Sequence, residues 1–202
     1  MTFSHYKKIS DAIVKEIKAG VDGIIIGHGT DTLAVTSAAL AFILENLSIP
    51  VILVGSQRSS DRGSTDAAMN LICAANFIAN ADFSGVALCM HESTADNTCL
   101  ILPACKTRKL HTSRRDAFKV VNDKAIARVD YETKKIEFLK EYDKKSDKKL
   151  VVKDKLDDKV AVLRVYPNMN SDLIDALTKK KIQGPCAGRF RNRPRSHQYQ
   201  RK

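Results

Sequence analysis

Apolar residues follow two different spacings along the first ninety positions of the chain. In one, apolar side chains recur three or four residues apart, as on the buried face of a helix. This spacing predicts helices in three segments, Tyr6–Ile17, Leu33–Leu47 and Leu71–Ile78. In the other, apolar residues follow one another without interruption, as in a strand covered on both faces. These runs predict strands over Gly23–Ile26, Pro50–Gly55 and Val86–Met90.

Helices and strands therefore alternate with short connections, which is the pattern of a parallel sheet flanked by helices. Beyond residue 90 the pattern is less regular. Ala125–Val129 and Lys135–Leu139 flank a polar turn and predict a β-hairpin. A stretch rich in Lys and Asp follows, from Asp143 to Lys159, and is typical of a solvated loop. One more strand and one more helix are expected after it, in Val160–Val165 and around Leu173–Leu177.

The chain of 202 residues is long enough for one domain, or for one domain and part of another. We place the first α/β domain at residues 1–139 and a charged linker at residues 140–158. The start of a second, smaller α/β domain is expected at residues 159–184, followed by a basic tail at residues 185–202. The second domain has room for one strand and one helix, too little to bury a core of its own.

The apolar pattern also bears on location. No run approaches the ~18 consecutive apolar residues of a membrane span. The first eight residues lack the apolar core and cleavage site of a secretory signal. We therefore expect a cytoplasmic protein that does not interact with membranes.

Charge is distributed unevenly along the chain. Residues 1–102 carry 6 Lys and Arg against 10 Asp and Glu, whereas residues 103–202 carry 28 against 13. A basic half can bind nucleic acid, but a lysine-rich solvated surface has the same composition. A basic RNA-binding module, centred on Lys106–Arg115 and the tail, therefore stays open as an alternative function.

The five cysteines show no pattern of a metal site, because none forms a Cys-x-x-Cys pair or has a histidine at metal-ligand spacing. Cys73 and Cys89 lie in apolar runs, as buried thiols do. We expect neither a structural metal ion nor disulfides.

Polar loops follow two of the predicted strands, at the sheet edge where ligands gather in parallel sheets. In Gly27–Thr32, two glycines let the backbone approach a ligand, and the Thr30 hydroxyl stands beside the Asp31 carboxylate. Capping of the next helix by Thr30 or Asp31 explains these residues equally well. For the second loop, Ser56–Arg62, a solvated connection with a capped helix is the simpler interpretation.

A third polar segment, Lys106–Phe118, is basic and lies far along the chain from the other two. A surface position is the commonest role of such a run. Lys109 gains a chemical role if it folds back beside Thr30 and Asp31. An ammonium flanked by a carboxylate can lower the pKa of a nearby hydroxyl, which makes a threonine a usable nucleophile or water activator. Spacing alone does not show that approach.

Three separated motifs resemble the L-asparaginase/glutaminase family, and they stand in the family's order. They are Asp22–Thr32, Val54–Arg62 and Arg108–Phe118. The second and third look most like one branch, the D subunits of archaeal glutamyl-tRNA(Gln) amidotransferases. The similarity extends from about Tyr6 to Gly184 and implies the α/β fold of an asparaginase N-terminal domain.

The resemblance implies a set of site residues. Thr30 is the second catalytic threonine of the family pattern, Asp31 its carboxylate and Lys109 the activating lysine. The substrate-binding positions that it implies are Gly29, Ser56 and Gln57. The implied chemistry is amide hydrolysis through an acyl-enzyme, which releases ammonia from glutamine without a metal ion or organic cofactor.

The resemblance also implies partners. An E subunit is expected to use ATP and to hold most of the tRNA(Gln) during amidation of Glu-tRNA(Gln), and the full-length form is expected to be a homodimer. A free-standing L-asparaginase is the alternative within the family.

The chain departs from the family pattern at both ends. The family's first catalytic threonine lies in a Thr-Gly-Gly-Thr-Ile motif on an opening strand, and this sequence contains no Gly-Gly. We therefore expect a fragment that lacks its first strand, associates readily and has little or no activity. After Gly184 the family has a strand and a Gly-x-Gly-His turn, whereas Pro185–Arg195 predicts neither strand nor helix. A one-base shift can restore that strand and turn, so we expect a frameshifted tail.

Overall fold

The computed structural model describes residues 1–179 and 184–188. By its internal contacts the chain divides into two units, Met1–Asp154 and Lys155–Lys202. The first unit contains a six-stranded sheet with helices, and the second contains a strand pair and a helix within the described residues. None of the helices in the described ranges is long and apolar enough to cross a membrane.

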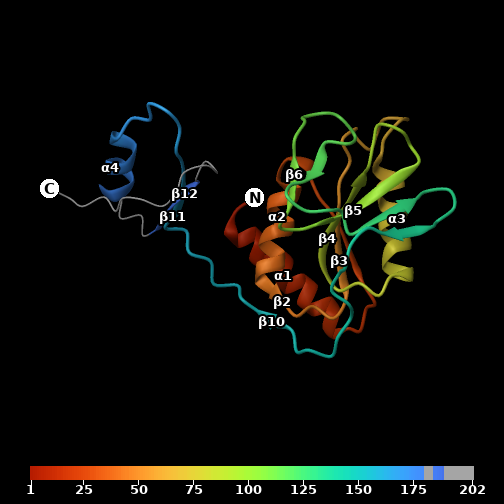
Figure 1. Ribbon diagram of the computed structural model, residues 1–202. Coiled ribbons are helices and arrows are strands. Elements are labelled where there is room, and N and C mark those ends of the chain that lie inside the picture. The colour runs from red at the N-terminus through yellow and green to blue at the C-terminus, as the bar shows by residue number, and fades with distance from the viewer. Residues whose placement is uncertain (180–183, 189–202) are drawn as a thin grey trace. The chain divides into compact units, whose positions relative to one another are not determined.

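The centre of the first unit is a mixed sheet with the strand order β1-β3-β4-β5-β8-β9 (Figure 1). β1, β3 and β4 are parallel to one another, whereas β5, β8 and β9 each run antiparallel to the strand before them in that order. The strands are β1 (Ile24–Gly27), β3 (Pro50–Val54), β4 (Gly85–His91), β5 (Thr98–Pro103), β8 (Ala127–Asp130) and β9 (Ile136–Phe138). The predicted α/β fold with a parallel sheet is confirmed, and an antiparallel half extends that sheet.

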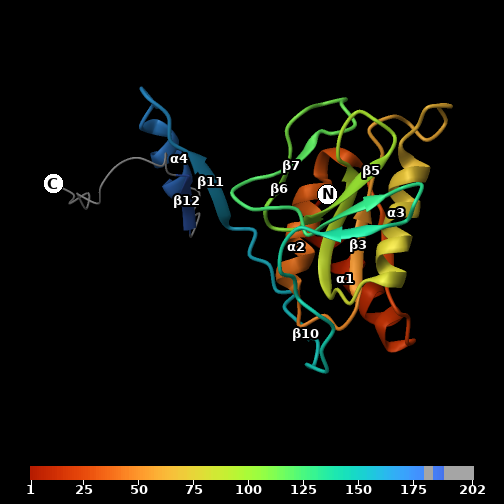
Figure 2. The same ribbon diagram turned by 45° about the vertical axis from the view of Figure 1, so that its right-hand side comes forward.

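Helices cover both faces of this sheet. α1 (Phe3–Lys18) and α2 (Thr30–Ile43) lie on one face and α3 (Ala67–Asn80) on the other, as the two views in Figures 1 and 2 show. Strand β3 separates the two resulting cores. Its residues are all buried, with Val51 and Leu53 in the core beneath α2 and Ile52 in the core beneath α3. This double burial explains the uninterrupted apolar run of the sequence.

The sequence analysis does not predict β5 or a second hairpin. In that hairpin β6 (Thr107–Lys109) pairs antiparallel with β7 (Phe118–Val120), and Lys109 lies opposite Phe118. Each strand has three residues, too few for a two-residue alternation to stand out. The hairpin carries the basic segment of the chain back against α2. A further short antiparallel pair joins β2 (Leu44–Glu45) to β10 (Val151–Val152).

The second unit is small. β11 (Val160–Arg164) pairs in parallel with β12 (Gly184–Gly188), and α4 (Asp172–Lys179) lies between them in the chain. The expectation that the residues after Gly184 form no strand is therefore wrong for β12, because backbone pairing with β11 needs no apolar pattern. The rest of the predicted tail, residues 189–202, lies outside the described residues. Val160 and Val162 remain 52% and 82% exposed, as expected for a unit too small to cover its own strand.

Candidate active site

The turn between β1 and α2 forms the first part of the candidate site. The backbone N–H of His28 donates to the carbonyl of Val54 at 2.8 Å, which keeps the turn beside the end of β3. Gly29 occupies the N-cap position, and α2 begins at Thr30. The interpretation that Thr30 or Asp31 caps this helix is therefore wrong, because both residues already lie in its first turn.

Lys109 reaches this turn from strand β6. Its Nζ donates to Thr30 Oγ1 at 2.9 Å and to Asp31 Oδ1 at 2.7 Å. The side chain of Lys109 is 13% exposed, whereas that of Asp31 is 93% exposed. The structure thus brings together the three side chains to which the resemblance gives catalytic roles. The ammonium approaches from the protein side, and the carboxylate faces solvent.

The ion pair determines what each group can do. Hydrogen bonding and the positive charge of Lys109 hold the pKa of the Asp31 carboxyl below its usual range. Asp31 also lies in the first turn of α2, where the helix dipole favours a negative charge. Because Thr30 Oγ1 accepts a hydrogen bond from an ammonium, its deprotonated form is stabilised. That is the property needed in a nucleophilic or water-activating hydroxyl.

The β6–β7 hairpin sets the position of Lys109. Phe118, its neighbour across the hairpin, is fully buried in the core beneath α2, together with Ala117. The backbone N–H of Leu110 donates to the carbonyl of Ala117 at 2.7 Å and closes the base of the loop 110–117. The burial of Phe118 on one side and the hydrogen bond that closes the loop 110–117 on the other therefore fix the position of Lys109.

Gly55 lets the end of β3 approach the turn between β1 and α2. A Cβ atom at this position would lie 2.9 Å from Thr30 Cγ2 and 3.0 Å from the carbonyl oxygen of His28. Only glycine fits such a close approach without displacing its neighbours. A Cβ atom added at Gly29, by contrast, meets nothing within 4 Å. Open space for a ligand therefore remains beside Thr30 on that side.

The two other predicted substrate-binding residues, Ser56 and Gln57, lie in the loop after β3, and both are partly exposed. The backbone N–H of Gln57 donates to Asp66 Oδ2 at 3.0 Å, and its side-chain Nε2 donates to the carbonyl of Arg114 at 2.7 Å. The Gln57 Oε1 atom is buried and has no hydrogen-bond partner among the described residues. The side-chain amide nitrogen of Gln57 therefore joins the loop after β3 to the loop 110–117.

Sequence reasoning does not single out several polar residues that support these loops. They are Asp66 and Asn70 at the start of α3, His91 at the end of β4, and Arg115 in the loop 110–117. The available signal is a pair of polar residues four positions apart at the start of an otherwise apolar helix. Such pairs usually reflect helix capping, which is why the pattern alone does not identify them.

Part of the basic segment is occupied by contacts within the protein. The guanidinium of Arg114 donates to both carboxylate oxygens of Asp116, at 2.9 Å and 3.0 Å, and Arg115 binds Asp96. Together with Lys109, these residues supply much of the charge that an RNA-binding module would use. Less of the positive charge of this segment is therefore free to bind an external anion.

The first unit also has a hollow of about 670 Å³ away from the turn between β1 and α2. The end of α2, the start of β4 and the segment 140–148 line it, and Thr30, Asp31 and Lys109 do not. No group of three or more His, Cys, Asp or Glu residues that could hold a metal ion occurs in the part of the chain that the structure describes.

Comparison with known proteins agrees with this geometry. The family profile described as "Asparaginase, N-terminal" matches residues 1–144. The D subunit of the glutamyl-tRNA(Gln) amidotransferase of Pyrococcus abyssi is 48% identical over 181 residues, which are 89% of this chain and 41% of that protein. The corresponding D subunit of Methanosarcina barkeri is 43% identical over 175 residues, which are 87% and 41% of the two chains. The chain thus spans about two-fifths of the length of these relatives.

Solved structures show the same fold. The thermostable L-asparaginase from Thermococcus kodakarensis has a TM-score of 0.78 at 27% identity, over 89% of this chain and 51% of the other. L-asparaginase I from Vibrio cholerae has a TM-score of 0.75 at 28% identity, over 88% and 51%. With the family profile matched over residues 1–144, these similarities show that the chain belongs to the asparaginase family.

Proposed function

We propose that this chain supplies the threonine, carboxylate and lysine of an amidohydrolase site that releases ammonia from glutamine for the amidation of Glu-tRNA(Gln). The double hydrogen bond from Lys109 to Thr30 and Asp31 carries the proposal. Membership of the asparaginase family supports hydrolysis of a side-chain amide. Similarity to amidotransferase D subunits, at 48% identity in one case, supports glutamine and tRNA-dependent amidation.

In the proposed reaction, water cleaves the amide, its nitrogen leaves as ammonia and the carbonyl carbon becomes a carboxylic acid. Lys109, held by Asp31, stabilises negative charge on Thr30 Oγ1 while that oxygen acts as nucleophile or activates water. The first backbone N–H groups of α2 have no partner within the helix and can stabilise the oxyanion that forms. The hydrolysis needs no cofactor in this proposal.

We further propose that the 202-residue chain alone releases little ammonia. It contains no Gly-Gly and therefore not the motif of the family's first threonine. Within the described residues β1 is an outer strand that pairs only with β3, so its other edge can accept a further strand. Because the groups of a catalytic set act as a unit, the lack of one typically costs about 10⁴-fold or more in rate.

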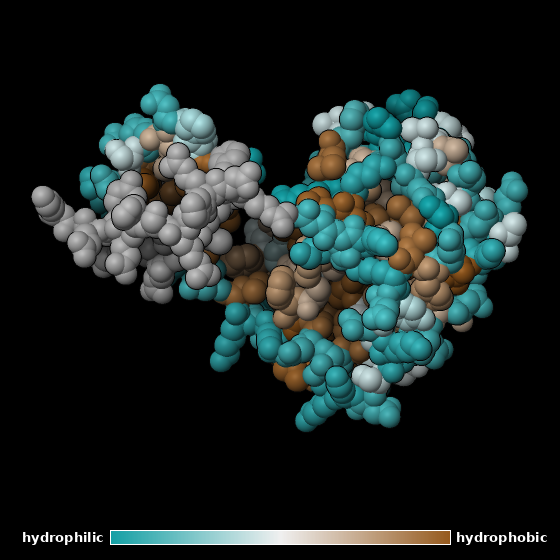
Figure 3. Space-filling model, in the orientation of Figure 1, coloured by the Kyte–Doolittle hydropathy of each residue, from teal (hydrophilic) through white to brown (hydrophobic). Residues whose placement is uncertain are grey.

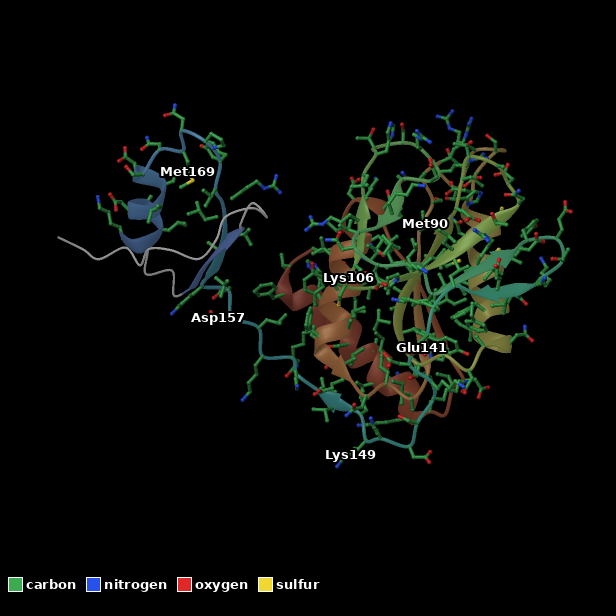
Figure 4. The ribbon with its side chains drawn as sticks, viewed as in Figure 1. Met90, Lys106, Glu141, Lys149, Asp157 and Met169 are labelled. Carbon is green, nitrogen blue, oxygen red and sulfur yellow. The ribbon has the colours of Figure 1, made fainter. Side chains whose placement is uncertain are left out.

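The test compares ammonia release from L-glutamine by the chain alone with release by an extended form, in which an opening segment carrying the Thr-Gly-Gly-Thr-Ile motif precedes it. We expect clear activity only in the extended form. Lys109→Met should lower its kcat by about 10³-fold, whereas Lys106→Met, at the exposed lysine labelled in Figure 4, should leave it unchanged. An unchanged rate in the Lys109→Met variant would overturn the proposal, and a preference for L-asparagine would favour a free-standing L-asparaginase.

The same similarity supports proposals about partners. We propose that an E subunit uses ATP and holds most of the tRNA(Gln), and that the full-length form is a cytoplasmic homodimer. Val35 and Phe42 of α2 are exposed, and apolar atoms gather over this helix in Figure 3, as on protein-contact surfaces. The thiols of Cys73, Cys89, Cys99 and Cys105 are free, as in a reducing compartment. Co-purification with a tagged E subunit tests the partnership, and sedimentation of the full-length form tests the dimer.

A further inference from the structure

Three polar side chains lie sealed beneath the candidate site and take no part in the proposed chemistry. Asp66, Asn70 and His91 are all at most 1% exposed, although they belong to elements that pack into the core beneath α3. Burial of polar groups is unfavourable unless their hydrogen bonds are satisfied. Their contacts therefore show what they hold in place.

Asp66 and Asn70 form hydrogen bonds with the backbone of the loop after β3. The Asp66 carboxylate accepts the backbone N–H groups of Gln57 at 3.0 Å and of Arg58 at 2.9 Å. Asn70 Nδ2 donates to the carbonyl of Gly55 at 2.9 Å and to Asp66 Oδ2 at 3.0 Å. Side chains from the next helix therefore fix the backbone on both sides of Ser56. Gly55 is also the residue against which Thr30 packs.

His91 supports Asn70 from the opposite side. The two donor hydrogens of the Asn70 amide point at acceptors on Gly55 and Asp66, so its Oδ1 must face His91. His91 Nδ1 lies 2.6 Å from that oxygen, and its Nε2 lies 3.1 Å from Asp96 Oδ1. Both ring nitrogens thus face acceptors. The ring therefore bridges the Asn70 amide and the Asp96 carboxylate.

Asp96 connects His91 to the loop 110–117, which contains Arg115. Asp96 accepts hydrogen bonds from His91 and from Arg115, and Arg115 also donates to the carbonyl of Ser64, within the loop after β3. Partial burial of Asp96 works in the opposite direction, but these hydrogen bonds hold the pKa of its carboxyl below the usual range. Asp96 is therefore a charged acceptor shared by His91 and Arg115.

The result is a ring of hydrogen bonds that joins the loop after β3 to the loop 110–117, which directly follows Lys109. A second, direct bond, from Gln57 Nε2 to the carbonyl of Arg114, joins the same two loops at the surface. One loop packs against Thr30, and the other continues from Lys109. Any change in the separation of the loops therefore alters the distance between the lysine and the threonine.

We propose that Asn70 and His91 are positioning residues, which keep Lys109 within hydrogen-bonding distance of Thr30 and Asp31 by locking these two loops together. His91 takes part through both ring nitrogens, one toward Asn70 and the other toward Asp96. The catalytic consequence rests on the proposed function, whereas the positional claim does not.

Several titratable or charged groups surround His91. Asp96 and Arg115 form the contacts described above, and Asp66 lies on the far side of the Asn70 amide. The thiol of Cys99 also donates to Asn70 Oδ1, at 3.3 Å. Contact with Cys99, together with burial, raises the pKa of the neighbouring Cys73 thiol, so both of these cysteines stay neutral near His91. Glu92, the next residue along the chain, is bound to Arg128.

The first test measures local hydrogen exchange in the full 202-residue chain. In Asn70→Ala, the Gln57 and Arg58 amides should exchange at least about tenfold faster, because loss of a buried partner weakens the grip of Asp66. The Ile52 amide in β3 should not change. Asn76→Ala is the matched control, since Asn76 lies on the same helix and its side chain bonds only the carbonyl of Lys134 and a neighbouring asparagine. Equal exchange in the two variants overturns the proposal.

The second test starts from the unmodified chain and decides the matter if Asn70→Ala fails to fold. Nitrogen-15 spectra of the unmodified chain report whether the ring nitrogens of His91 form hydrogen bonds with Asn70 and Asp96. We expect both hydrogen bonds. In His91→Phe, which removes them, the Gln57, Arg58 and Arg115 amide signals should shift.

Two outcomes of the second test overturn the proposal: a His91 ring that forms neither hydrogen bond, or a folded His91→Phe variant in which none of the three amide signals moves. Neither test uses ammonia release. Failure of the proposed function, seen as an unchanged rate in Lys109→Met, is therefore distinguishable from failure of the positioning role.

Discussion

Two polar loops leave the same edge of the sheet, one after β1 and one after β3, and their carboxylates have different partners. In the first loop Asp31 is exposed and pairs with Lys109, 78 residues further along the chain. At the end of the second loop Asp66 is buried, and it binds backbone N–H groups of Gln57 and Arg58, nine and eight residues before it. One loop meets a distant cation, and the other is held by the helix that follows it.

The difference separates a chemical role from a structural role. A buried carboxylate that accepts several backbone hydrogen bonds stabilises the fold, because its removal leaves those N–H groups unsatisfied. An exposed carboxylate paired with one ammonium contributes little to stability. The convergence of Lys109 on Thr30 and Asp31 is therefore better explained by chemistry than by folding.

The largest expected effect is on rate in the first loop. Asp31→Ala in the extended form should lower the rate of ammonia release from L-glutamine by about 10³-fold, because Lys109 loses the carboxylate that holds it. Its free energy of unfolding should stay nearly unchanged, since the carboxylate is exposed. A coupled ammonia assay measures the rate, and denaturant titration measures the free energy of unfolding. A large loss of stability with an unchanged rate would give Asp31 a structural role instead of a chemical one.

The second loop should show the opposite behaviour in stability. Asp66→Ala should lower the free energy of unfolding by about 2–4 kcal/mol, because two backbone N–H groups and the Asn70 amide lose their acceptor. Asp61→Ala, at an exposed position of the same loop, is the control and should stay within about 0.5 kcal/mol. Urea titration of each variant checks this. If Asp66→Ala and Asp61→Ala have the same free energy of unfolding, Asp66 does not hold the loop.

The contact between the two loops can be disturbed directly. Gly55→Ala places a methyl group against Thr30 and the carbonyl of His28, so it should destabilise the fold by about 1–3 kcal/mol. Gly27→Ala is the matched control, because an added Cβ there meets nothing within 4 Å. Thermal unfolding of the two variants measures the difference. A Gly55→Ala variant as stable as Gly27→Ala would show that the loops have room to move apart.

The smallest effect concerns pH. Lys109 lowers the pKa of Asp31, so the ion pair is complete above the ordinary value of about 3.9 and is lost as the pH falls through the lowered value. In Lys109→Met, the Asp31 carboxyl should titrate closer to about 3.9. Carbon-13 signals of the carboxyl group report both midpoints. The same midpoint with and without the lysine would mean that the pair does not form in solution.

The parallel half of the fold could be predicted from the sequence, but most of the antiparallel half could not. β3 and β4 are buried on both faces and therefore appear in the sequence as continuous apolar runs. β1 is equally apolar in sequence, although as an outer strand it is only partly buried. The β8–β9 hairpin also shows in the pattern, because a polar turn separates two apolar stretches. β6 and β7 are too short to show a period, and their pairing depends on the burial of Phe118. β12 has no apolar pattern at all.

The site was only partly predictable. Thr30 and Asp31 stand out after a buried strand, but spacing did not separate catalysis from helix capping until Gly29 proved to occupy the cap position. The approach of Lys109 depends on a hairpin that the pattern does not show, so only the resemblance to a family suggested it. Asn70 and His91 were not singled out, because lone polar residues within apolar elements carry no signal of the loops that they hold.

The central claim is that Lys109 and Thr30 act as one catalytic unit, and a double-mutant cycle in the extended form tests it most directly. Ammonia release from L-glutamine is measured for Thr30→Ala, Lys109→Met and the variant with both changes. We predict that each single change removes nearly as much activity as the two together, because either one disables the shared hydroxyl. Losses that multiply as independent effects, or a Lys109→Met variant with full activity, would contradict the account.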